Sequence, residues 1–77
     1  MRAMETVKQA SINSGVNLAT ISKTVGKCRG YVNAIITRNS EPRIDTLVRL
    51  LNACNYGVYV IEKQHAPSDV MEITVDE

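Results

Sequence analysis

Apolar residues recur every three or four positions over most of the chain, the spacing that places them on one face of an α-helix. This pattern predicts four helices, over residues 3–14, 18–25, 29–37 and about 44–53. The residues expected to face inward are Met4, Val7, Ala10, Ile21, Val25, Val32, Ile35, Ile44, Leu47, Val48 and Leu51, with Ile36 a further candidate. Because each helix carries one apolar stripe, we expect the four to share one aliphatic core.

The residues between these segments are typical of helix ends. Gly15 suits the left-handed backbone that follows a helix C-terminus, and Asn17 is a good N-cap for the second helix. Gly26 permits a sharp turn, and Cys28 falls in the N-cap region of the third helix. A linker this short cannot hold two helices end to end, so we expect the second and third helices to cross.

The periodicity changes after Gly57. Segment 58–63 is β-branched and aromatic, and segment 70–75 alternates with period two. We therefore predict two β-strands in an appendage that covers residues 58–77, behind a four-helix domain that covers residues 1–57. The predicted fold class is mainly α, of the α+β type.

The two predicted strands also suggest how the chain self-associates. A lone two-stranded hairpin is marginal in water, and an unpaired strand edge invites pairing with a second copy. We therefore expect a homodimer joined through this region. The expected interface residues are Val58, Tyr59, Val60, Ile61, Met71, Ile73 and Val75. The alternative is a hairpin folded back on the first and fourth helices, with dimerisation through the fourth helix or none.

The net charge of +1 conceals a segregation of charge along the chain. All nine basic residues lie within 1–63, where only four acidic residues occur. The acidic residues of the tail, which contains no base, are Asp69, Glu72, Asp76 and Glu77. This asymmetry indicates a body that faces a polyanion, or else a solvated surface with chance segregation.

Composition narrows the functional classes. A chain of 77 residues is one domain, and no apolar run approaches the roughly 20 residues that span a bilayer. The N-terminus lacks the apolar stretch of a signal peptide, so we expect a cytoplasmic protein with no membrane partner and with reduced cysteines. His65 has no metal-ligand spacing with Cys28 or Cys54 and no motif partner for catalysis, so we expect no metal, no cofactor and no enzyme.

Residues 17–36 have the layout of a helix-turn-helix: a capped helix, a glycine turn and a second helix. Over residues 7–56 the chain resembles the Cro/C1-type (XRE) helix-turn-helix family without a gap. "GYVNAI" over 30–35 is similar to the family's "s-y-i-S-r-i" run, and "PRIDTL" over 42–47 to its "P-s-l-e-t-L" run. Ile21-Ser22 stands where the family has leucine–alanine. The resemblance implies a lambda-repressor-like bundle.

The chain also departs from the family pattern. Leu18 replaces a residue that is usually polar, and Ile36 replaces a glutamate. Lys27 and Arg38 add positive charge where the family has an apolar residue and a glycine.

The resemblance implies that the third helix reads base edges of double-stranded DNA. The expected base-reading residues are Arg29, Gly30, Asn33 and Ala34. Arginine can bind guanine and asparagine can bind adenine through two hydrogen bonds each, whereas small residues let the backbone come close. The structural alternatives are a solvated arginine at the helix start and an asparagine that contacts backbone or solvent.

Polar residues around this helix are expected to contact phosphates, which set the docking register. They are Asn17, Lys23, Lys27, Cys28, Tyr31, Thr37, Arg38, Asn39 and Arg43. Tyr31 has packing against the first turn as an alternative, and each charge alone is more often simply solvated.

The resemblance therefore implies a sequence-specific transcriptional regulator, such as a phage or mobile-element repressor or Cro-like protein, that binds an inverted repeat as a homodimer. One alternative is an antitoxin that represses its own operon and binds a toxin. Another is a protein-binding module in which Gly30, Ala34 and Ile36 form the contact.

Overall fold

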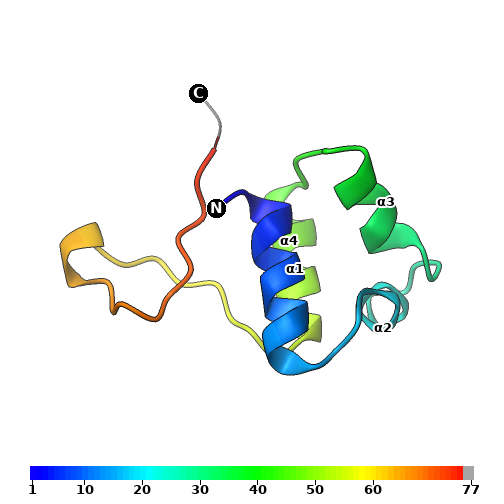
Figure 1. Cartoon of the computed structure of the whole chain (residues 1–77), viewed down its shortest axis with the longest axis horizontal. Helices are drawn as coiled ribbons and strands as arrows, with labels where there is room; N and C mark the ends of the chain where they lie inside the picture. The colour runs from blue at the N-terminus through cyan, green and yellow to red at the C-terminus, as the bar shows by residue number, and fades with distance from the viewer. Residues whose placement is uncertain (76–77) are drawn as a thin grey trace.

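The structure is a computed structural model of the whole chain, and it describes residues 1–75. Its helices are α1 (Ala3–Ser14), α2 (Leu18–Thr24), α3 (Tyr31–Thr37) and α4 (Ile44–Ala53), and a single 3₁₀ turn, η1 (Lys63–His65), follows them. Helices α1 and α4 pack against each other, and α2 and α3 pack beside this pair (Figure 1). The four predicted helices are thereby confirmed.

The core is aliphatic and lies between the four helices. The buried apolar residues are Ala3, Met4, Val7, Ala10, Ile21, Val32, Ile35, Leu47, Leu50, Leu51 and Cys54. Val25 and Ile36 are half-buried against the core, and Val48 is half-buried on α4. The prediction for Ile44 is wrong: this first residue of α4 is exposed, and Leu50 is fully buried instead. The apolar stripe of α4 runs from Leu47 towards its C-terminus, and Ile44 precedes the part that packs.

Two predicted helix ends are confirmed by their geometry. Gly15 ends α1 with φ at 74°, and its N–H donates to the Ser11 carbonyl at 3.0 Å. Asn17 caps α2, because its side-chain oxygen accepts a hydrogen bond from the Thr20 N–H at 2.8 Å. Gly26 makes the turn after α2 with φ at 79°, a left-handed conformation that glycine adopts readily.

The predicted start of α3 needs correction. The N-cap is Gly30 rather than Cys28, so residues 28–30 form a turn before the helix. The Cys28 carbonyl accepts a hydrogen bond from the Tyr31 N–H at 3.1 Å, which closes this turn. Cys28 itself is exposed.

The predicted β-strands are wrong: within the described residues 58–75 there is no strand, only an irregular arm that contains η1. The arm leaves the end of α4, turns, and returns to the N-terminus of the chain (Figure 1). No backbone hydrogen bond joins its two limbs within this range, although Lys63 Nζ lies 3.7 Å from Glu72 Oε1. A strand exists only with a ladder partner, and β-propensity does not supply one.

The returning limb of the arm is attached to the helical bundle at two places. The Thr74 N–H donates to the Met1 carbonyl at 2.7 Å, and Met71 is half-buried against the core. The arm therefore returns to the start of α1, as the fold-back alternative expected, but not as a hairpin. Of the acidic tail, Asp76 and Glu77 lie outside the described residues.

Candidate nucleic-acid interface

A buried serine holds α2 and α3 together. The Ser22 hydroxyl is fully buried; it donates to the Leu18 carbonyl at 2.8 Å and accepts from the Val32 N–H at 3.1 Å. The first N–H groups of a helix have no partner within the helix, and Gly30 has no side chain to cap them. Ser22 therefore caps α3 from the neighbouring helix and fixes the crossing of the two.

The four residues expected to read bases lie on one exposed surface at the start of α3. Arg29 and Gly30 belong to the turn before α3. Asn33 lies four residues after Arg29, and Ala34 lies four residues after Gly30, in the first turns of α3. All four residues are exposed. Arg29 and Asn33 make no side-chain hydrogen bond or ion pair with any residue of the range 1–75. The two side chains that carry base-reading chemistry are thus both available to a ligand.

Gly30 is exposed, so a ligand can approach its backbone closely. A β-carbon built on it would have no atom of the chain within 4 Å, and its φ of −90° is ordinary for any residue. Packing inside the protein therefore does not require glycine at this position. What it leaves free is space on the outer surface, next to Arg29 and Ala34.

Positive charge surrounds this surface without compensation. Between Glu5 and Glu41 the sequence contains no acidic residue. The bases of this stretch that lie on or beside α2 and α3 are Lys23, Lys27, Arg29 and Arg38, and all are exposed. None of the four is in an ion pair with an acidic residue of the described chain. The ammonium group of Lys27 lies 5.6 Å from the centre of the half-buried Tyr31 ring, so the two predicted phosphate contacts are adjacent.

Other residues expected to contact phosphates lie differently. Thr37 and Cys28 are exposed. The Asn17 side chain is engaged as the cap of α2, and Arg43 Nε lies 3.5 Å from Asp45 Oδ1 at the start of α4. The Asn17 side-chain oxygen is therefore already engaged, whereas the Arg43 side chain remains exposed beside Asp45.

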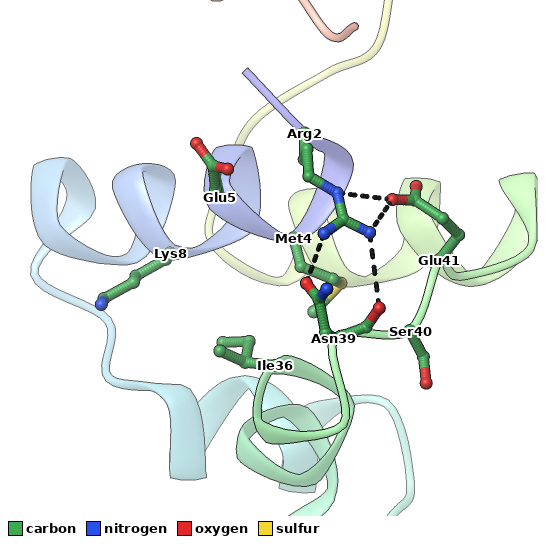
Figure 2. Close-up of a pocket in the computed structure, with 8 residues that line it drawn as sticks. All are labelled: Arg2, Met4, Glu5, Lys8, Ile36, Asn39, Ser40 and Glu41. Atoms are coloured by element: carbon green, nitrogen blue, oxygen red, sulfur yellow. Dashed lines mark hydrogen bonds and ion pairs between the residues drawn. The ribbon is translucent and has the colours of Figure 1, made fainter. Parts of the chain in front are cut away.

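Asn39 is engaged in a cluster that the sequence did not indicate. Arg2 reaches from the start of α1 to the loop after α3, where its guanidinium donates to the Asn39 side chain and to Glu41 (Figure 2). The Arg2 Nε to Glu41 Oε1 distance is 2.8 Å, and Asn39 has a positive φ of 55°. Arg2 lies outside the stretch that resembles the family, and a single arginine near a terminus carries no periodic signal.

The cluster forms one wall of a small cavity. Its volume is about 140 Å³, and Met4, Lys8 and Ile36 also line it. The cluster ties the C-terminal end of α3 to α1, whereas Ser22 ties its N-terminal end to α2. Helix α3 is therefore held at both ends, and its outer face is left free.

The chemistry of the remaining polar residues is sparse. Across residues 1–75, no three histidine, cysteine or acidic side chains come close enough together to hold a metal ion. His65 Nδ1 lies 3.3 Å from Glu62 Oε2, both exposed in the arm, a pairing that the sequence did not indicate. None of the helices in the described chain has the length and apolar character needed to cross a membrane.

No protein-family model, curated protein or solved structure matches this chain.

Proposed function

We propose that this chain is a sequence-specific double-stranded DNA-binding transcriptional regulator with a lambda-repressor-like helix-turn-helix. In this proposal α3 is the recognition helix, and Arg29, Gly30, Asn33 and Ala34 read base edges. It acts in the cytoplasm, as a phage or mobile-element repressor or Cro-like protein does. The observation that carries the proposal is the exposed, acid-free surface around α3, with its unpaired cations.

The geometry of the α2–α3 pair supports this function. A recognition helix must be held rigidly by its base while its outer face enters the major groove. Ser22 and the Arg2 cluster hold the two ends of α3, and Val32 and Ile35 anchor its inner face in the core. The outer face is free of internal contacts that DNA binding would have to break.

The charge distribution supports the same function. Phosphate contacts supply most of the affinity of DNA-binding proteins, and they require cations not already neutralised by the protein. Lys23, Lys27 and Arg38 meet this requirement. By contrast, Ile36, which the protein-binding alternative needs at the surface, is half-buried against the core.

The first test concerns base reading. A duplex is selected from a random-sequence pool by the wild-type protein, and binding to it is compared with binding to a shuffled duplex. Arg29→Ala should weaken binding to the selected duplex by about 1–3 kcal/mol and relax discrimination at one base. Lys27→Ala should weaken binding to both duplexes by the same factor. Lys63→Ala, which removes the same charge from the arm, is the control and should change neither.

Gly30→Ala tests how closely DNA can approach the start of α3, because the added methyl group causes no clash within the protein. Its new methyl group meets no atom of the chain, so the free energy of unfolding should fall by about 1 kcal/mol at most, the cost of alanine in place of glycine at an N-cap. Affinity for the selected duplex should fall, because the methyl group intrudes where the backbone approaches the bases. If Arg29→Ala and Gly30→Ala both left the preference for the selected duplex intact, α3 would not be the recognition helix.

Salt dependence separates DNA binding from protein binding. If two copies together neutralise about eight phosphates, the slope of log K against log salt concentration should be near −7. A slope near zero, measured by fluorescence anisotropy on the selected duplex, would contradict the proposal.

A further inference from the structure

Lys27 lies in the turn between α2 and α3, and its side chain lies over an aromatic ring. The Lys27 ammonium group is 5.6 Å from the centre of the Tyr31 ring, within the roughly 6 Å over which the face of a ring attracts a cation. Among residues 1–75, no acidic side chain forms an ion pair with Lys27. The ring is therefore the partner that this ammonium group has within the protein.

The fold holds both members of this pair in place. The Lys27 N–H donates to the Ser22 carbonyl at 3.0 Å, and Gly26, with φ at 79°, turns the chain just before it. Tyr31 is the first residue of α3, and its half-buried ring packs against the core. The Lys27 backbone and the Tyr31 ring are thus both fixed, and the lysine side chain is the mobile part of the pair.

The hydroxyl group of Tyr31 is not used by the fold. It makes no hydrogen bond within the part of the chain that the structure describes. Tyr31 could therefore serve DNA binding in two ways: its hydroxyl could contact a phosphate directly, or its ring could act through Lys27. The attraction of a cation is to the face of the ring, so the second way needs no hydroxyl.

We propose that Tyr31 is a positioning residue, whose ring holds the Lys27 ammonium group ready for a DNA phosphate. This role rests on the proposed function and deepens it, since it differs from the direct phosphate contact that the sequence suggested for Tyr31. A lysine side chain loses rotamer freedom when it binds a phosphate, and a ring that restricts it beforehand reduces that loss. An ammonium group has more than one N–H donor, so it can stay over the ring while it donates to a phosphate oxygen.

Lys23 provides the matched comparison within the same chain. It lies in the last turn of α2, beside the same surface, and it is exposed as Lys27 is. Over the described range, no aromatic ring lies next to its ammonium group. A change at Tyr31 should therefore affect the contribution of Lys27 to DNA binding and leave that of Lys23 as it is.

The first measurement uses the full chain without DNA. An aromatic ring shields nuclei above its face, so the methylene protons next to the Lys27 ammonium group should resonate upfield of those of Lys23 in the proton NMR spectrum. Tyr31→Leu should abolish this upfield shift, and Tyr31→Phe should retain it. Equal shifts for the two lysines in the wild type would overturn the proposal.

The second measurement is a double-mutant cycle on the selected duplex, by fluorescence anisotropy at one salt concentration. Tyr31→Leu should raise the dissociation constant by about two- to fivefold, and Tyr31→Phe should restore the affinity because it restores the ring. In a Lys27→Ala background, Tyr31→Leu should have no further effect. In a Lys23→Ala background it should keep its full effect, because the two residues do not share a contact.

Two binding results would overturn the proposal. A Tyr31→Phe variant as weak as Tyr31→Leu would show that the hydroxyl contacts the phosphate itself. An equal effect of Tyr31→Leu with and without Lys27 would show that the ring acts through packing alone.

Circular dichroism checks that Tyr31→Leu keeps its helix content. If that variant unfolds, the wild-type NMR comparison of Lys27 with Lys23 and the affinity of Tyr31→Phe still decide the matter. Failure of the proposed function is distinguishable from failure of this role, because in that case the wild type binds no duplex, whatever residue stands at position 31.

Discussion

The helical bundle and the arm contain similar apolar residues but use them in opposite ways. In the bundle, Leu50, Ile21 and Val32 have no exposed surface. In the arm, Val60 has no buried surface, and Met71 is the half-buried residue of the described range 57–75. The arm begins only a few residues after Cys54, the last buried residue of the core.

The difference shows that apolar content does not itself create a core. In α1 and α4 the apolar residues are spaced so that one helix face meets another, and backbone hydrogen bonds form within each helix. In the arm, residues 58–61 are β-branched and aromatic and residues 70–75 alternate with period two, patterns typical of strands, whose backbone hydrogen bonds need a second strand. The apolar residues of the bundle are covered within one chain, whereas those of residues 58–61 stay exposed.

The largest expected difference between the two regions is the cost of removing an apolar side chain. Leu50→Ala should lower the free energy of unfolding by about 2–5 kcal/mol, because it leaves a cavity in the core. Val60→Ala should change that free energy by less than about 0.5 kcal/mol in the monomer. Urea unfolding at low protein concentration measures both. Equal losses would mean that the arm is part of the folded core.

A smaller difference is expected for buried and exposed hydroxyl groups. Ser22→Ala leaves the buried Val32 N–H without a partner and should destabilise the bundle by about 1–3 kcal/mol. Thr74→Ala removes a hydroxyl that accepts an exposed hydrogen bond from Met1 and should change stability by less than about 0.5 kcal/mol. Amide hydrogen exchange at Val32 should also accelerate in Ser22→Ala. An unchanged exchange rate at Val32 would show that Ser22 does not cap α3.

Helix capping provides a third comparison. Asn17→Ala removes the cap of α2 and should cost about 1 kcal/mol. Gln64 lies within η1, and its side chain donates to the Glu62 carboxylate at 3.2 Å with both residues exposed, so Gln64→Ala should leave thermal unfolding unchanged. A stability loss in Gln64→Ala that matched that of Asn17→Ala would show that η1 contributes to the cooperative unit.

The smallest effect is expected from Cys54, which marks the end of the core. Burial raises the pKa of its thiol above the ordinary value of 9.0, against the opposing effect of its hydrogen bonds. The folded state therefore keeps its proton to a higher pH than the unfolded state does. The contribution of Cys54 to the free energy of unfolding should be constant below pH 9. It should decline as the pH rises towards the pKa of the folded state.

The matched variant for this effect is Cys54→Ala. Its free energy of unfolding should decline less steeply than that of the wild type above pH 9. Both proteins should carry Cys28→Ser, so that the two proteins differ only in the thiol at position 54. Identical alkaline slopes for the two proteins would mean that the thiol at position 54 is not shielded from water.

Several elements of the fold and of the candidate site could be predicted because their signals are local. The caps of α1 and α2 depend on Gly15 and Asn17, which act on atoms within a few residues of themselves. The exposure of Asn33 follows from helical periodicity once Val32 and Ile35 are placed inside. The engagement of Asn39 by Arg2 could not be predicted, because it joins residues far apart in the sequence.

The sequence by itself determined the four helices, the turn at Gly26 and the acid-free stretch between Glu5 and Glu41, because each depends on neighbours or on composition alone. Only the tertiary structure decided the outcome for residues 58–75, the burial of Leu50 in place of Ile44, and the role of Ser22. The physical reason is that helical hydrogen bonds join residues four apart. Hydrogen bonds between strands, core contacts and caps from a neighbouring helix join residues that are far apart in the sequence, and only the fold decides which of these lie close together.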